Sequence, residues 1–106
     1  MEKILNVFYQ DTLMGILSLE VDGMRYAYTD AYLKNPNAHI LSQSLPLEKK
    51  EFKHMECYPF FSGLLPDAPV RQTIAKYLGI STENVFGLLE AIGGECAGAI
   101  SFYPQD

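Results

Sequence analysis

His54 and Cys57 stand three positions apart and are the residues of this chain whose types could support nucleophilic chemistry. A cysteine becomes a nucleophile when a nearby base stabilises its thiolate and another group orients that base. Closeness in the sequence does not create this geometry, and the scattered acidic residues offer no assignable acid–base pair. Ser62-Gly63 is not a nucleophile elbow, because the G-x-S-x-G context is missing. These patterns predict that the chain is not an enzyme.

A second chemical candidate is the glycine-rich run Gly93–Gly98, which could cradle a phosphate. It follows an expected helix and leads into an expected strand, whereas a phosphate loop has the opposite order and carries a Lys-Ser/Thr pair. We interpret the run as a helix stop, with glycine in left-handed conformations, and a tight strand entry. His39 and His54 have no metal-ligand spacing around them. No metal and no cofactor are therefore expected.

Charge and cysteine content narrow the possible partners and compartment. The formal net charge is −5 and the basic residues form no stripe, which argues against direct nucleic-acid binding. Cys57 and Cys96 are too few for a disulfide framework, so we interpret them as reduced, partly buried thiols. The chain shows no signal-peptide pattern and no run of about 18 apolar residues. We expect a cytoplasmic protein.

The first third of the chain is predicted to form a three-stranded antiparallel meander. A two-residue hairpin turn is expected at Asp22-Gly23, because type I′ turns need positive φ. Gly15 is expected at a bulge or a close approach. The predicted strands are Lys3–Tyr9, Leu13–Val21 and Met24–Thr29. Alternation assigns two sets of side chains to single strand faces: Leu13, Leu17, Leu19 and Val21 in the second strand, and Met24, Tyr26 and Tyr28 in the third.

The middle and end of the chain are predicted to be mostly helical. Residues 31–47 are expected to be irregular, with a turn at Asn35–Asn37 and a short strand over His39–Leu45, and Glu48–Glu56 is expected to form a surface connection. The first helical segment is predicted from Tyr58, with Pro59 in its first turn and a stop at Pro66. The next is predicted over Ala68–Leu78, between Asp67 as N-cap and Gly79 as C-cap, and a third from Ser81 to Gly93-Gly94. A last strand is expected over Ala97–Tyr103.

Strands followed by helices and one returning strand indicate an α+β fold. We expect a single domain over residues 1–106. Its sheet is an antiparallel meander, or a small barrel-like sheet, in which the C-terminal strand returns to the N-terminal strands. Two to three helices from residues 58–92 pack against it.

The segment Tyr58–Leu78 is the strongest candidate for a protein interface. Phe60, Phe61, Leu64 and Leu65 are all apolar and lie just before Pro66. On a single helical turn the first three share a face, and Leu65 lies about 100° further round. One interpretation places all four in the core. The other places an exposed apolar tip on a proline-fixed loop, which is a good interface anchor.

With these residues in view, the chain resembles the N-terminal subdomain of HipA-type serine/threonine kinases, the toxins of Hip toxin–antitoxin modules. The resemblance covers essentially the whole chain. It is carried by the opening strands with Tyr26 and Tyr28, by LSQSLPL (Leu41–Leu47), by FFSGLLPDAPVRQTIAKYLGIS (Phe60–Ser81) and by LLEAIGGECAGAISFYP (Leu88–Pro104). No ATP-binding loop, catalytic-loop Asp or metal-binding Asp of a kinase can be assigned.

The resemblance implies a subunit cut from, or encoded separately from, a kinase. In split HipBST systems a small HipS-like protein acts as antitoxin to a HipT-like serine/threonine kinase, alongside a HipB-like DNA-binding protein. The alternative is a scaffold that bridges the kinase and the HipB-like protein without inhibiting. The resemblance narrows the partner-binding residues to Ser62, Gly63, Leu64, Leu65, Pro66 and Asp67. It moves Phe60, Phe61 and the helical stripe Val70, Ile74, Tyr77 and Leu78 to the core.

Overall fold

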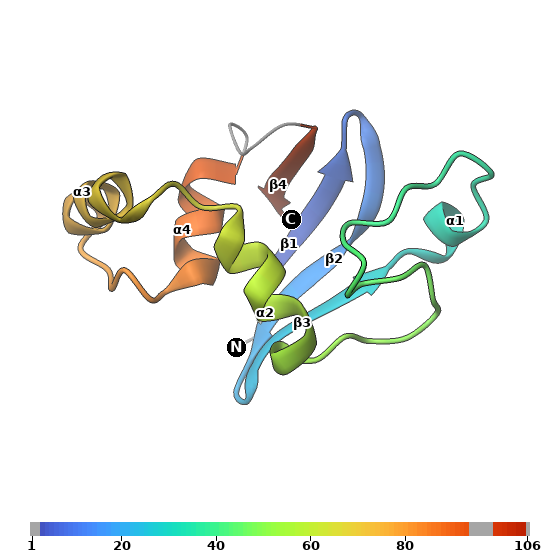
Figure 1. Cartoon of the computed structure of the whole chain (residues 1–106), viewed down its shortest axis with the longest axis horizontal. Coiled ribbons are helices and arrows are strands. Elements are labelled where there is room, and N and C mark those ends of the chain that lie inside the picture. Colours follow the sequence, from blue (N-terminus) through green and yellow to red (C-terminus); the bar gives the residue numbers. More distant parts are fainter. Residues whose placement is uncertain (1–2, 94–98, 106) are drawn as a thin grey trace.

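The structure, a computed structural model, describes residues 3–93 and 99–105 of the chain (Figure 1). Its strands are β1 (Lys3–Tyr9), β2 (Thr12–Glu20), β3 (Gly23–Tyr28) and β4 (Ile100–Pro104). Its helices are α1 (Asp30–Leu33), α2 (His54–Gly63), α3 (Ala68–Leu78) and α4 (Val85–Ile92). The order of elements confirms the predicted α+β fold.

The four strands form one antiparallel sheet in the order β3-β2-β1-β4. The C-terminal strand β4 returns to pair with β1, as predicted, so the sheet joins the two ends of the domain. Alternate strand residues are buried and pack under the helices, and Figure 1 shows α2 crossing in front of the sheet. The buried strand residues are Leu5, Val7, Met14, Leu17, Met24, Tyr26, Tyr28 and Phe102.

The prediction that one face of the second strand carries Leu13, Leu17, Leu19 and Val21 is wrong at both ends. The pairing of β1 with β2 shifts between Val7 and Phe8, so that one extra residue, Met14, enters the strand opposite them. Such a bulge reverses the alternation. Met14 is therefore buried like Leu17, and Leu13 faces outward instead of sharing the face of Leu17.

The β2–β3 hairpin turns one residue earlier than predicted. Val21 and Asp22 form the loop, which leaves Val21 fully exposed, and Gly23 pairs with Glu20 as the first residue of β3. Gly23 has φ of 120°, whereas Asp22 has no positive φ, so the turn is not the expected type I′. The predicted close approach at Gly15 is confirmed, because a Cβ there would collide with the hydroxyl of Tyr26.

The segment between β3 and α2 is held mainly by tyrosine hydroxyls. The turn at residues 35–37 is confirmed, but the predicted strand over 39–45 is wrong: only an isolated bridge joins Ser42 to Leu45. The hydroxyl of Tyr28 donates to the Leu45 carbonyl and accepts from the Leu41 N–H. These two hydrogen bonds of the Tyr28 hydroxyl take the place of the backbone hydrogen bonds that a strand would make. Phe52, in the expected surface connection, is buried and its backbone pairs with Tyr26.

Helix α2 begins at His54, four residues before the predicted start at Tyr58. The carboxylate of Glu56 accepts a hydrogen bond from the Lys53 N–H at 3.1 Å and stabilises this earlier start. Pro59 therefore lies inside the helix rather than in its first turn.

Helix α3 has the predicted bounds, with Asp67 at the N-cap and Gly79 in the left-handed conformation at the C-cap. Helix α4 is capped by the side chain of Asn84, not by the predicted Ser81. At its end Gly93 is right-handed, not left-handed; a side chain there would collide with the Phe102 carbonyl of β4.

The interior confirms Phe61 as a core residue and corrects the stripe on α3. Phe61 is fully buried, and Phe60 is half-buried against the core. On α3, all of which is described, Val70 is 48% exposed, Tyr77 82% and Leu78 43%, so this stripe is not in the core as predicted. Ala75 is the buried residue of this helix.

Tyr26 and Tyr28 are expected to respond in opposite ways to replacement by phenylalanine. Tyr28→Phe leaves the Leu45 carbonyl and the Leu41 N–H without their side-chain partner and should cost about 1–3 kcal/mol of unfolding free energy. Tyr26 has a buried hydroxyl with no hydrogen-bond partner among the described residues, so Tyr26→Phe should be neutral or stabilising. Urea unfolding of both variants tests this; a loss at Tyr26 equal to that at Tyr28 contradicts it.

The hydrogen bonds of the Glu56 carboxylate at the start of α2 predict that the stability of the domain depends on pH. The side chain of Lys50 and the Lys53 N–H, which both bond the exposed Glu56 carboxylate, lower the pKa of Glu56 from 4.5. A lowered folded-state pKa contributes stability above the unfolded value, and that stability is lost as the pH falls through the folded value. The difference in melting temperature between wild type and Glu56→Gln should therefore shrink below pH 4.5. Thermal melts at neutral and acidic pH measure it, with exposed Glu48→Gln as control; a constant difference contradicts the assignment.

Candidate partner-binding surface

The predicted partner-binding residues Ser62–Asp67 form the connection between α2 and α3. Leu64 caps α2, with its N–H bonded to the Phe61 carbonyl, and the Leu65 N–H bonds the Ser62 carbonyl at 3.3 Å. After Pro66 the chain is extended at Asp67, and α3 begins. The segment is thus a tight turn with its own hydrogen bonds.

The expected exposed apolar tip is corrected by the burial of Leu65. Its side chain is 8% exposed and belongs to the core, and Leu64 is half-buried against the same core. Gly63 and Asp67 are the exposed members, while Ser62 and Pro66 are half-buried. Leu65 therefore anchors the turn from within. The outward surface of the turn consists of the Gly63 backbone, the Asp67 carboxylate and parts of Leu64 and Pro66.

Arg71 holds this turn in place, a role that sequence reasoning missed. Its Nη2 donates to the Ser62 carbonyl at 3.0 Å, so α3 is tied to the end of α2. The Arg71 Nε is buried without a hydrogen-bond partner among the described residues. The other arginine, Arg25, pairs with the carboxylates of Glu20, Asp22 and Glu51. The sequence holds one signal that Arg71 lies near this turn: it stands four residues after Asp67, which is one helical turn into α3.

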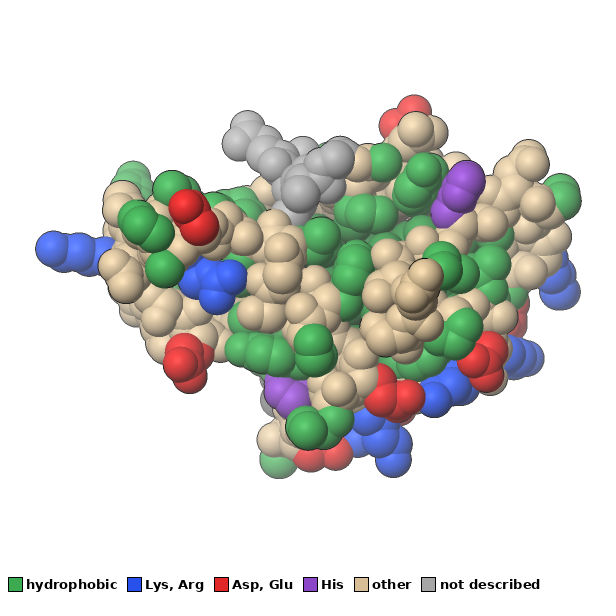
Figure 2. Space-filling view, in the orientation of Figure 1, with side chains coloured by type: hydrophobic (Ala, Val, Ile, Leu, Met, Phe, Trp, Pro, Cys, Tyr) green, Lys and Arg blue, Asp and Glu red, His purple; other side chains and the backbone are tan. Residues whose placement is uncertain are grey.

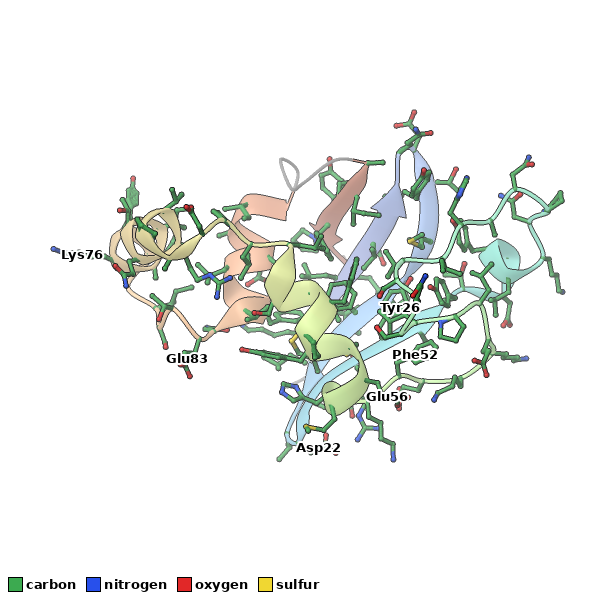
Figure 3. The ribbon with its side chains drawn as sticks, viewed as in Figure 1. Asp22, Tyr26, Phe52, Glu56, Lys76 and Glu83 are labelled. Carbon is green, nitrogen blue, oxygen red and sulfur yellow. The ribbon has the colours of Figure 1, made fainter. Side chains whose placement is uncertain are left out.

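Two hollows flank α3. One, of about 390 Å³, is polar and mixed in charge, and Figure 3 shows Glu83 near it, on the stretch that joins α3 to α4. Its lining residues are Tyr58, Ala68, Arg71, Gln72, Thr82 and Glu83. The other, of about 310 Å³, is apolar and lies between α3 and α4, lined by Thr73, Ile74, Tyr77, Leu78, Ala91 and Ile92. Figure 2 shows hydrophobic side chains at the surface of the α3 end of the molecule.

The residues considered for nucleophilic chemistry are not arranged for it. Cys57 is a free, fully buried thiol, and burial raises its pKa to about 11, which opposes thiolate formation. The Nδ1 of His54 accepts from the Met24 N–H at 3.1 Å, and the imidazole packs on Tyr58. Both side chains serve the packing of α2 on the sheet.

The remaining chemical candidates are reported for the described part of the chain. Within residues 3–93 and 99–105, no three His, Cys, Asp or Glu side chains gather in a way that could hold a metal ion. The glycine-rich run beyond Gly93, and Cys96 with it, lies outside the described residues. None of the described helices has the length and apolar character to span a membrane.

Comparison with known proteins supports the resemblance. A putative kinase of Sinorhizobium fredii, Y4mE, is 39% identical over 105 residues, which are 98% of this chain and 25% of Y4mE. A Haemophilus influenzae protein described as uncharacterized is 27% identical over 93% of this chain and 90% of its own length. In the solved complex of Shewanella oneidensis HipA, HipB and operator DNA, one chain superposes with a TM-score of 0.82 and 30% identity, over 95% of this chain and 24% of that chain.

The chain thus spans about a quarter of the length of the curated kinases that it matches. The matching family model is described as the HipA N-terminal domain and covers residues 5–103. This range includes all four helices and all four strands, except for the first two residues of β1 and the last residue of β4. The chain belongs to the HipA N-terminal domain family.

Proposed function

We propose that this domain is a non-catalytic antitoxin subunit that binds and neutralises a HipT-like serine/threonine kinase. The observation that carries the proposal is the family match over residues 5–103, in a chain that aligns with only a quarter of HipA-type kinases. Such a domain would supply in trans the contact that a fused HipA keeps within one chain. The Ser62–Asp67 turn is the proposed point of contact with the kinase.

The geometry of the turn supports this role. Leu65 fixes it from the core side, and Arg71 fixes it through the Ser62 carbonyl. A segment that is ordered before binding loses less conformational entropy when it docks. The exposed Gly63 and Asp67 lie at the outer side of the turn. They would meet the kinase without any rearrangement of the core.

A scaffold role is the second candidate. It is favoured by one observation: the solved Shewanella complex contains HipA, HipB and operator DNA together. In that case this domain would bridge or stabilise the kinase and a HipB-like protein and leave kinase activity intact. In this proposal the HipB-like partner contacts the DNA, and the net charge of −5 on this chain supports that division.

Growth assays separate the two roles. A HipT-like serine/threonine kinase is expressed alone and together with this chain. Restored growth is expected from an antitoxin. If the two proteins copurify and toxicity persists, the scaffold is favoured and neutralisation is contradicted.

The turn itself is tested by Gly63→Arg. A Cβ at Gly63 meets nothing within 4 Å, so the variant should fold normally while it places a long charged side chain at the proposed contact. We expect kinase binding to weaken by about tenfold or more, a change of about 1.4 kcal/mol, and rescue of growth to be lost.

The matched control is Asn37→Arg. Asn37 is exposed in the loop after α1, which lies at the opposite end of the molecule from α3 (Figure 1). It adds the same charge and should bind as wild type. Calorimetry or surface plasmon resonance measures both variants. Equal affinity of Gly63→Arg and wild type would remove Ser62–Asp67 from the interface.

A further inference from the structure

Helix α3 has an amphipathic sequence, but most of its apolar stripe is exposed. Val70, Ile74, Tyr77 and Leu78 follow one face, and three of them are more than 40% exposed. Isolated helices of this length are marginal in water, and most helices gain stability by packing an apolar face. Within the described chain α3 buries Ala75 alone. Figure 1 shows α3 at one end of the molecule, away from the sheet.

Three residues of this stripe, Ile74, Tyr77 and Leu78, form one wall of the apolar groove between α3 and α4, together with Thr73. Ala91 and Ile92 of α4 form the other wall, and none of the lining residues within the described part of the chain is charged. A groove of this composition accepts apolar side chains, because a charged group placed there would lose water without gaining a partner. Its ligand is therefore an apolar protein surface.

The size of a stable interface links this groove to the turn. Stable protein interfaces use about 20–30 residues on each side. The six residues Ser62–Asp67 are too few, so a partner that touches them must also cover adjoining surface. The stripe begins at Val70, three residues after Asp67, and continues along the same helix. The Arg71 side chain ties α3, the helix that carries the stripe, to the Ser62 carbonyl at the end of α2.

We propose that the kinase which contacts the Ser62–Asp67 turn also inserts apolar side chains into the α3–α4 groove. This inference rests on the proposed function and names the second part of its interface. The turn gives orientation, and the groove supplies the buried apolar core on which affinity depends. In the longer relatives the same face would be available to the three quarters of the chain outside this domain.

The experiment is a charge-neutral double substitution of two residues that line the groove, Thr73→Asp with Tyr77→Lys. The two new charges stand four positions apart with the acid first, and the Lys lies near the C-terminal end of α3, so the helix is preserved. The net charge stays at −5, which leaves long-range attraction to the kinase unchanged. The matched control is Val21→Asp with Met55→Lys: both side chains are strongly exposed, at 109% and 86%, and lie outside the groove.

We expect the groove variant to bind the HipT-like kinase at least about tenfold more weakly than wild type does, and the control to bind within about twofold of wild type. Circular dichroism and thermal melts verify folding of both. If the groove variant is unfolded, Tyr77→Ala against Met55→Ala repeats the comparison with a milder truncation. Binding of the groove variant equal to that of the control overturns the inference.

The remaining outcomes separate this inference from the proposed function. If wild type binds and neutralises the kinase and the groove variant does so equally well, the function stands and the groove is excluded. If wild type does not bind the kinase, the proposed function fails and this inference fails with it. If wild type sediments as a dimer that the groove substitutions dissociate while kinase binding is unchanged, a second copy of this chain occupies the groove, and the inference is overturned.

Discussion

A continuous line of buried aromatic rings joins the sheet to the helices, and the position of every other functional feature depends on it. Tyr26 of β3 packs against Phe61 of α2 with ring centroids 5.5 Å apart, and Phe61 packs against Phe102 of β4 at 5.9 Å. The two edge strands of the sheet are thereby connected through one helix. Figure 3 shows Tyr26 and Phe52 close together, and the backbones of these two residues bond each other. Gly15 makes room for the Tyr26 ring on the neighbouring strand.

Phe61 immediately precedes the Ser62–Asp67 turn, so the aromatic line also sets where that turn lies. Leu65 enters the same core four residues later. One buried side chain just before the turn and another within it leave the backbone of the turn little conformational freedom. The hydrogen bond from the Arg71 guanidinium to Ser62 reduces that freedom further. The apolar density that makes this segment conspicuous in the sequence serves mainly to hold it. The outward part of the turn is small and consists of the Gly63 backbone, the Asp67 carboxylate and parts of Leu64 and Pro66.

The opposite holds for α3. Its bounds are set by local signals, Asp67 and Pro69 at its start and Gly79 at its end. Of its apolar face, Ile74 is half-buried against the core, and Val70, Tyr77 and Leu78 remain at the surface. The domain thus combines a turn held firmly by the core with a helix whose apolar face is mostly exposed. Both features suit a domain that forms part of a larger assembly, as the matched domain does in the solved HipA complex.

The sequence by itself determined the α+β order of elements, the meander, the bounds of α3 and the family, because these follow from local periodicity, capping residues and specific motifs. Only the tertiary structure decided which apolar residues are core. Leu65 and the α3 stripe look alike as patterns, yet Leu65 is buried and the stripe is not. Met14 replaced Leu13 inside the sheet because of a bulge that depends on pairing with β1. The contact of Arg71 with Ser62 spans two helices. Hydrophobicity specifies that a side chain seeks cover, while the packing of distant elements determines whether the domain or a partner provides it.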